Sequence, residues 1–531
     1  MKKEKIVKFI TKDWVILVIL FVFGLLFVTQ YSEHLDQKTE QGILYSNALS
    51  YCNKTGMFPS FAQRMSKEGI VPIEESIDKD HGEAVFYPLI WIYYVNNNNS
   101  FLGNIIWHTY IYCFNFIGVI CLYFLLKSIF SKSTAVISTL LFFLTPAMFA
   151  HSHYNNKDMI LLTLTLIVFY LGYKMTDEKK IKYAVLYGIA GAFCANVKII
   201  GVPIWGFILV CRTVEMLIRK KADGKYFLSL GIASVIAVIG YIAITPASWM
   251  NLKDYIMLSL DQAKNFRWGD YVLFNGQAVS DSLSGIPRRY LPVMITMTTP
   301  IGILLLILTG TVAMVISTVK SKGDSKILYG IYASVCCFIP LAYAVLTKAV
   351  VYNGWRHFYF VYASMIMLAA FGINLCLSLK RKRIYAMIIG AYSVFLLIEI
   401  LSGNPFQYSY YNEVSRFFVE DRFETDYWNM SFKQAAELIA RNDESKHILV
   451  SGCDTPTRWG ISPAIRTLRG KDRMRMEYTE DWRNSDYVII NFSYSILYSP
   501  RDSEYVENNY ELIKTFKAYG NKLCAVYKRK E

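Results

Sequence analysis

The chain is poor in charged residues. Only 18% of its 531 residues are Asp, Glu, Lys or Arg, whereas 54% are hydrophobic and 15% are aromatic. Soluble domains carry about a quarter charged residues, so this composition argues against an ordinary soluble protein. The ten cysteines form no C-x-x-C pair, and most of them fall inside apolar runs. This spacing predicts neither a disulfide framework nor a zinc site, and we expect no metal and no cofactor.

Three further patterns are missing. There is no GxxxxGK nucleotide loop and no internal repeat, and no small-residue cleavage site follows the first apolar run, where the sequence reads Thr29-Gln30-Tyr31-Ser32-Glu33. The first run is therefore predicted to be an uncleaved helix. The net charge of +15 could indicate nucleic-acid binding, but the basic residues lie in short clusters between apolar runs. We therefore expect no nucleic-acid partner.

Apolar runs of membrane-spanning length dominate the first 402 residues. A span needs about 18 or more largely apolar residues. We predict about eleven transmembrane helices, at residues 14–30, 104–126, 133–150, 159–173, 183–196, 199–217, 227–247, 292–318, 327–346, 358–379 and 384–402. The stretch 183–217 is divided at Asn196-Val197-Lys198, because one long span would leave Lys198 in hydrocarbon.

Alternate connections between these runs are basic, which indicates orientation. One side carries the N-terminal lysines (Lys2, Lys3, Lys5, Lys8 and Lys12), Lys127, Lys132, Lys174, Lys179, Lys180, Lys182, Arg219, Lys220, Lys221, Lys225, Lys320, Lys322, Lys326, Lys380, Arg381, Lys382 and Arg383. The short connections on the other side carry only Lys157, Lys198, Lys348 and Arg356. The pattern predicts a multi-pass protein of the plasma or inner membrane, with a cytoplasmic N-terminus and an extracytoplasmic C-terminus.

Three long polar segments fall on the outer side: 31–103, 248–291 and 403–531. The first contains amphipathic stretches such as Gly42–Tyr51, which predict helices lying on the membrane surface. The transmembrane domain is predicted to span 1–402. Residues 403–531 should form a small α/β domain, with a helix at Ser431–Arg441 and strands at His447–Ser451, Asp486–Phe492 and Lys522–Lys528.

Polar clusters on this outer side are the candidate site residues. They are Asp36 and Glu40; Asp80 and His81; His151, His153, Lys157 and Asp158; Arg288 and Arg289; Arg356 and His357; and Lys198. Each cluster alone is more simply explained as a solvated helix end, a charged turn or an interfacial anchor. The His-x-His pair could bind a metal, but interfacial histidines explain it more simply.

The clusters are more informative together, because acids and bases converge on one membrane face. Lysines and arginines suit a lipid phosphate, and a carboxylate beside them suits general-base catalysis on a hydroxyl. The combination predicts group transfer from a lipid-linked phosphate donor. A transporter or flippase of lipid-linked sugars is the competing class, but transporters tend to show repeats and polar residues near the bilayer midplane.

Five stretches carry a resemblance to a known family. In order they read TPAMFAHSHYNNKDM, IPRRYLPVMITMTTP, YNGWRHFYFVY, NPFQYSYYNE and RFETDYWNMSFKQAAE. Over nearly the whole chain, the sequence resembles bacterial glycosyltransferase family 39. This family groups dolichyl-phosphate-mannose protein mannosyltransferases with aminoarabinose transferases. It implies the α-helical, multi-span C-type glycosyltransferase fold.

The resemblance implies an inverting hexosyl- or pentosyltransferase with a polyprenyl-phosphate sugar donor and a hydroxyl acceptor in a protein, lipid or cell-envelope glycan. The family's first outer loop carries an Asp-Glu pair whose Asp is the base. Asp36 matches that Asp, but Gln37 follows it, so an inactive homologue is a further alternative. Asp80-His81-Gly82 resembles the second motif of this loop. The leaving phosphate would be held by Lys157, Lys198, Arg356, His357, Arg288 and Arg289.

Overall fold

The computed structural model describes residues 12–265, 271–280, 285–320, 325–351, 353–493 and 499–531. Within these ranges, eight helices are long and apolar enough to span a membrane. They are α6 (Ser100–Ile129), α9 (Asp158–Glu178), α11 (Gly201–Ile218), α12 (Gly224–Ile244), α15 (Ile301–Lys320), α16 (Ser325–Thr347), α17 (Phe360–Ser378) and α18 (Lys382–Ser402). The predictions that concern Lys2, Lys3, Lys5, Lys8, Lys322 and Tyr352 lie outside the described residues.

Three further predicted runs also form helices. Helices α7 (Lys132–Phe143) and α8 (Pro146–Tyr154) make a ninth span if they are counted together, with a bend of 68° between them. The shorter apolar helices α2 (Asp13–Leu25) and α10 (Ile181–Val197) cover the remaining two runs. The break after Val197 confirms the predicted division of 183–217, and it leaves Lys198 in the link before α11.

Two predicted spans are interrupted at Thr-Pro pairs. The run 133–150 breaks between Thr145 and Pro146, and the run 292–318 is divided into α14 (Tyr290–Thr298) and α15 at Thr299-Pro300. Proline disfavours the helical conformation of the residue before it, and Thr145 and Thr299 have ψ of 112° and 132°. The prediction of single continuous helices was wrong at these two points.

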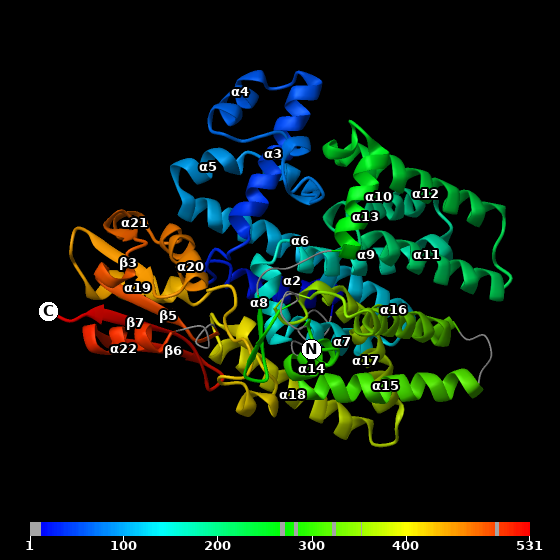
Figure 1. Cartoon of the computed structure of the whole chain (residues 1–531). Coiled ribbons are helices and arrows are strands. Elements are labelled where there is room, and N and C mark those ends of the chain that lie inside the picture. The colour runs from blue at the N-terminus through cyan, green and yellow to red at the C-terminus, as the bar shows by residue number, and fades with distance from the viewer. Residues whose placement is uncertain (1–11, 266–270, 281–284, 321–324, 352, 494–498) are drawn as a thin grey trace, which may run out of the picture.

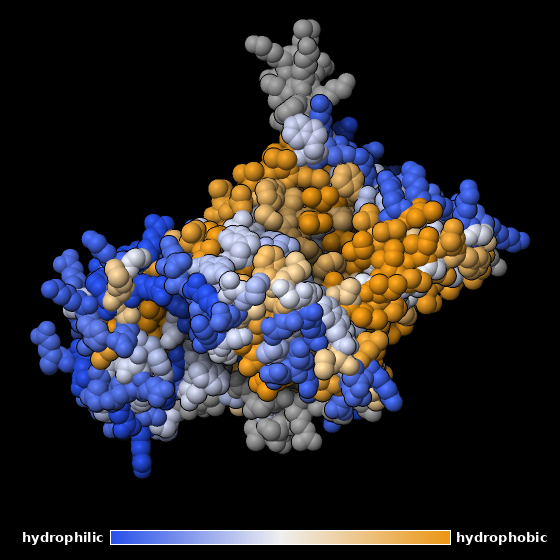
Figure 2. All heavy atoms as spheres, turned by 90° about the horizontal axis from the view of Figure 1, so that it is seen from above, coloured by the Kyte–Doolittle hydropathy of each residue, from blue (hydrophilic) through white to orange (hydrophobic). Residues whose placement is uncertain are grey.

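The outermost helices face away from the protein core. In α12 and α15, only 17% of the spanning window is buried inside the protein. Figure 2 shows the resulting apolar surface, with the hydrophilic C-terminal domain at one end. An apolar surface of this extent is unfavourable in water, so these helices are suited to contact with lipid.

The first outer loop is largely helical. It contains α3 (Gln37–Thr55), α4 (Pro59–Lys67), the short 3-10 helices η1 (Ile73–Glu75) and η2 (Ala84–Leu89), and α5 (Ile92–Asn98). Gly42–Tyr51 is helical as predicted, but Ile43, Leu44 and Leu49 in α3 are buried. This helix is therefore part of the core and does not lie exposed on a membrane surface.

The second outer loop carries η3 (Pro246–Ser248), α13 (Leu252–Asn265) and a hairpin of β1 (Val272–Phe274) and β2 (Gln277–Val279). Its turn, Asn275-Gly276, has positive φ at both residues, as two-residue hairpins favour. Gly276 N donates to Arg422 O at 3.1 Å, and Phe274 bridges to Phe423. The hairpin therefore contacts the segment after α18.

The C-terminal domain contains a five-stranded sheet in the order β4-β3-β5-β7-β6. Its strands are β3 (Ile448–Gly452), β4 (Met476–Tyr478), β5 (Tyr487–Asn491), β6 (Tyr510–Ala518) and β7 (Asn521–Arg529). Strand β3 is parallel to β4 and β5, and β7 is antiparallel to β5 and β6. The helices are α19 (Phe432–Asn442), α20 (Thr455–Arg466), α21 (Gly470–Arg475) and α22 (Pro500–Asn509). The predicted helix and three predicted strands are confirmed.

The connecting segment after α18 packs into the protein core. It contains η5 (Gln407–Ser409) and η6 (Ser415–Phe418), and it buries Tyr408, Tyr411, Phe423 and Trp428. One cluster of buried hydrophobic side chains runs from the membrane helices through this segment into the sheet. Figure 1 shows the sheet domain at one end of the helices, beside the first outer loop. The domain is therefore docked against the helices.

The alternation of basic connections predicts that the C-terminus lies outside the cytoplasm. A reporter that is active only outside the cytoplasm should work when it is fused after Glu531. A reporter that needs the cytoplasm should be silent at the same position. The opposite result would contradict the assignment of the polar clusters to the outer face.

Candidate active site

Asp36 and Arg356 form an ion pair between two segments far apart in the chain. Asp36 lies at the N-cap position of α3, and Arg356 begins η4 (Arg356–Phe358), between α16 and α17. Arg356 Nη1 donates to Asp36 Oδ2 at 3.1 Å. The Asp36 side chain is 47% exposed, whereas that of Arg356 is 9% exposed. The site thus offers an accessible carboxylate held by a buried cation.

Arg356 is held on its other side by aromatic rings of the connecting segment. Its guanidinium carbon lies 4.5 Å from the ring centre of Trp428 and 5.8 Å from that of Tyr427. Burial alone would lower the pKa of Arg356, but Asp36 and Asp158 outweigh it and raise the pKa. The guanidinium is therefore kept charged in a largely dry position.

Asp158 and Lys198 form a second ion pair beside the first. The Lys198 ammonium contacts Asp158 Oδ1, and Asn155 Nδ2 donates to Asp158 Oδ2 at 3.2 Å. Partly buried His357 follows Arg356, and burial and Lys198 lower its pKa well below the usual value. Lys198, Arg356 and His357 are thus brought together as the sequence predicted, with Asp158 among them.

The two histidines of the His-x-His pair face different partners. His151 Nδ1 lies 3.3 Å from Asn155 Nδ2, and its Nε2 lies 3.4 Å from the Tyr427 hydroxyl. His153 Nδ1 and Nε2 lie 2.7 and 2.9 Å from the backbone oxygens of Phe149 and Gly24. His151 therefore lies in the site, whereas His153 connects α8 to α2. Among the described residues, no group of three or more His, Cys, Asp or Glu is placed to hold a metal.

Lys157 and Glu40 belong to a separate buried cluster. Lys157 Nζ lies 2.8 Å from Glu83 Oε1 and 3.2 Å from Glu40 Oε2, and it donates to Gly82 O at 2.9 Å. Burial raises the pKa of Glu83. The Lys157 ammonium offsets burial at Glu40 and lowers its pKa. The ammonium is surrounded by protein acceptors, so the arrangement favours a role in fixing the first loop.

Asp80 and His81 lie next to this cluster in the chain. Their side chains approach at 3.2 Å, with His81 45% exposed. The carbonyl of the following residue, Gly82, is the one that binds Lys157. No ion pair or hydrogen bond among the described residues joins Asp80 or His81 to Asp36 or Arg356.

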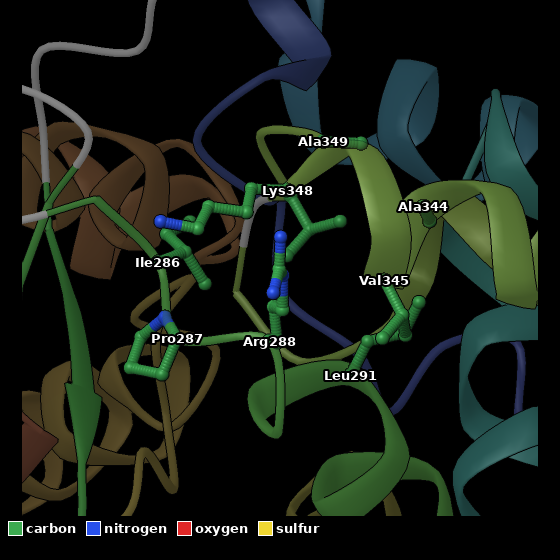
Figure 3. A pocket seen from close by; sticks show the side chains of 9 residues that line it. Ile286, Pro287, Arg288, Leu291, Ala344, Val345, Lys348 and Ala349 are labelled. Carbon is green, nitrogen blue, oxygen red and sulfur yellow. The ribbon is translucent and has the colours of Figure 1, made fainter.

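Arg288 and Lys348 point into a shallow pocket on another face of α16. Figure 3 shows both side chains directed into the same space, among Ile286, Pro287, Leu291 and Val345. Among the described residues, neither cation has an ion-pair partner. The neighbouring Arg289 instead lies over Phe274, at 5.7 Å from the ring centre. The pocket encloses only about 10 Å³, and its lining includes neither Asp36 nor Arg356.

A large apolar cavity opens beside the Lys198 cluster. It encloses about 390 Å³ and is lined by residues of α9, α11, α16 and α17, namely Thr165, Phe169, Ile200, Pro203, Ile204, Phe207, Ile208, Cys336, Ile339, Pro340, Tyr343, Phe360 and Ser364. Two of these, Ile200 and Phe360, follow closely after Lys198 and His357 in the chain. The cavity is therefore suited to an apolar chain whose anionic end lies near Lys198 and Arg356.

Sequence reasoning missed Glu424, a buried acid of the connecting segment. Asn353 Nδ2 donates to its Oε1, and its Oε2 has no well-aligned hydrogen-bond partner among the described residues. Glu424, His151 and Tyr427 line a cavity of about 30 Å³, which is room for ordered water. Burial raises the pKa of Glu424 to about 8, although Asn353 opposes the shift. The one sequence signal for Glu424 was its place in the RFETDYW stretch, between aromatic residues.

The fold defines the class, a multi-span membrane protein with the C-type glycosyltransferase fold. Residues 92–249 match the family described as dolichyl-phosphate-mannose-protein mannosyltransferase. The resemblance to glycosyltransferase family 39 is thus confirmed. No curated protein sequence matches the chain.

Three solved structures align with almost the whole chain. The crystal structure of ArnT from Cupriavidus metallidurans bound to undecaprenyl phosphate aligns with a TM-score of 0.50 and 10% identity, over 97% of this chain and 98% of that one. Its apo structure gives 0.48 and 12%, over 97% of both chains. The Archaeoglobus fulgidus oligosaccharyltransferase in complex with zinc and sulfate gives 0.39 and 11%, over 97% of this chain and 73% of that one.

The raised pKa of Glu424 predicts a pH-dependent stability. The fold favours the neutral acid, so stability is highest below the ordinary value near 4.5 and falls as pH rises toward about 8. Glu424→Gln keeps the shape without a charge, so its melting temperature should fall less than that of the parent between pH 5 and pH 9 in detergent. Glu420→Gln, at an exposed acid, is the control. Parallel melting curves for parent and Glu424→Gln would contradict the assignment.

Proposed function

We propose that the protein transfers a sugar from a polyprenyl-phosphate donor to a hydroxyl acceptor, with inversion, at the extracytoplasmic face of the cell membrane. One observation carries this proposal: an exposed carboxylate, Asp36, is paired with buried Arg356 next to the cations at the mouth of an apolar cavity. The family match supports a glycosyltransferase, and the similar ArnT structure holds undecaprenyl phosphate.

The apolar cavity would take the part of the donor's lipid chain nearest its phosphate, with the phosphate at the end beside Lys198. There the phosphate would meet Lys198, Arg356 and His357. Lys198 is paired with Asp158 in this structure, so a phosphate would compete with that carboxylate for the ammonium. A charge-assisted pair with a guanidinium is directional, because its fork can bind two phosphate oxygens. Lys157 is assigned a positioning role instead, since its ammonium already faces Glu40, Glu83 and Gly82 O.

The chemical step is a single displacement at the anomeric carbon. The acceptor oxygen forms its bond to this carbon as the bond to the phosphate oxygen breaks, through an oxocarbenium-like state. Asp36 takes the hydroxyl proton, and the electron pair of the broken bond leaves with the phosphate. Arg356 and Lys198 stabilise the developing charge, and such preorganised stabilisation is typically the largest catalytic contribution.

Gln37 does not argue against this assignment. Its side chain is 2% exposed, and it turns toward α6, donating to Asn104 Oδ1 at 2.9 Å and lying 3.0 Å from His108 Nε2. A glutamate at this position would occupy the same buried place, away from the Asp36–Arg356 pair. The proposal of an inactive homologue rested on Gln37 alone, and the geometry gives it no support.

The base assignment predicts the effect of one isosteric change. Asp36→Asn keeps the shape but removes the basicity, so sugar transfer should fall by about a hundredfold to ten-thousandfold. Expression and binding of undecaprenyl phosphate should be retained. Glu40→Gln is the matched control on the same helix, and it should reduce transfer less. Parental transfer by Asp36→Asn would overturn the assignment, and it would direct attention to Asp80.

The donor assignment predicts a separate effect at Arg356. Arg356→Ala and Arg356→Lys should both weaken use of the polyprenyl-phosphate donor, because lysine lacks the planar fork. The lost contact corresponds to about 2–3 kcal/mol, which is measurable as weaker binding of undecaprenyl phosphate to the purified protein. Arg381→Ala, at an exposed arginine on the predicted cytoplasmic side, serves as the control. Unchanged binding in both Arg356 variants would reduce Arg356 to an interfacial anchor.

A further inference from the structure

We propose that the C-terminal domain and the connecting segment that leads into it position the segment that carries Asp36, through Arg466 and Lys433 of the domain and Trp428 of the connecting segment. This inference rests on the proposed function, because it treats Asp36 as the base. The segment runs from the end of α2 at Leu25 to the start of α3 at Gln37 and has no regular structure after Ser32. A base on an irregular segment needs support from other parts of the protein to keep one geometry.

The start of α19 binds the backbone in the first half of this segment. Lys433 Nζ donates to Thr29 O and, at 3.3 Å, to Tyr31 O. Gln434 Nε2 donates to Gln30 O at 3.1 Å. Lys433 is 5% exposed, so its ammonium depends on these carbonyls for its hydrogen bonds. Three consecutive carbonyls after α2 are thus bound by two adjacent side chains of the C-terminal domain.

Arg466, at the end of α20, binds Glu33, three residues before Asp36. Its Nε lies 3.0 Å from Glu33 Oε2, and its Nη2 lies 2.5 Å from Glu33 Oε1, so the guanidinium and carboxylate form a two-pronged pair. Glu33 is 8% exposed. The backbone oxygen of Arg466 also accepts from Ser100 Oγ at 2.8 Å, which ties the same residue to the start of α6. Planar pairs of this kind fix orientation as well as distance.

Trp428 connects the segment to Arg356. Its ring centre lies 4.7 Å from that of His34 and 4.5 Å from the Arg356 guanidinium carbon. Both ring nitrogens of His34 are buried without a well-aligned hydrogen-bond partner among the described residues, so the contact with Trp428 is a principal restraint on this ring. The same indole therefore restrains both sides of the Asp36–Arg356 pair.

The arrangement makes the C-terminal domain part of the catalytic geometry, although it supplies no group to the reaction itself. Glu33 is bound by Arg466 of the domain, and His34 is in contact with Trp428 of the connecting segment. Asp36 follows His34 by two residues. A misplacement of about 1 Å can reduce a rate about a hundredfold. We call the contacts of Lys433, Arg466 and Trp428 with residues 29–34 the clamp. Loosening the clamp should lower turnover. It should leave the donor cavity unaffected, because that cavity lies between membrane helices.

The test uses the full-length protein with Arg466→Ala and the milder Glu33→Gln. Arg483→Ala is the matched control, because Arg483 pairs with Asp502 at 3.2 Å in the same domain and contacts no part of the Asp36 segment. Amide hydrogen exchange of residues 31–40 should rise in the first two variants and stay parental in the control. Turnover should fall about tenfold to a hundredfold, with the donor KM within about threefold.

The outcomes separate the clamp from the proposed function. Unchanged exchange at residues 31–40 in both Arg466→Ala and Glu33→Gln would overturn the clamp. Faster exchange with parental turnover would overturn its positioning role. If Arg466→Ala does not fold, Glu33→Gln decides alone. If the proposed function is wrong, Asp36→Asn should transfer sugar at the parental rate. That result would not change the conclusion drawn from hydrogen exchange at residues 31–40.

Discussion

The site is built around the need to hold the Arg356 guanidinium where little water reaches it. An unpaired charge in such a place is costly, and three widely separated parts of the chain compensate it. Asp36 comes from the first outer loop, Asp158 acts from the start of α9, and the Trp428 ring comes from the segment after α18. The ion pair therefore explains why the loop, the helices and the C-terminal domain converge at one point.

On the proposed function, this convergence would bring the reaction next to the lipid chain of the donor. Lys198, which follows α10, and Arg356, which precedes α17, lie close in the chain to Ile200 and Phe360 of the apolar cavity between membrane helices, and the Asp36 carboxylate is accessible. A lipid-linked donor and a water-exposed acceptor could thus approach from different sides. The proposed displacement requires the two substrates to meet in line at the anomeric carbon.

Much of the fold could be predicted from hydropathy and charge. The alternation of basic links required a break at Asn196-Val197-Lys198, and α10 ends there. The sequence also predicted three of the five strands of the C-terminal sheet. The same alternation placed Asp36, Lys198 and Arg356 on one face. The breaks at Thr145-Pro146 and Thr299-Pro300 were missed because hydropathy continues through them, although proline carries the signal.

Pairing between side chains was beyond the sequence. Nothing local distinguishes Lys157, which faces Glu40 and Glu83, from Lys198, which faces Asp158. Glu33 and Arg466 are separated by 433 positions in the chain, and only packing shows that they meet.

One measurement tests the central claim most directly: the anomeric configuration of the product that the purified protein forms from a polyprenyl-phosphate sugar of known configuration, determined by NMR. A single displacement assisted by Asp36 predicts inversion, and a product with retained configuration would contradict it.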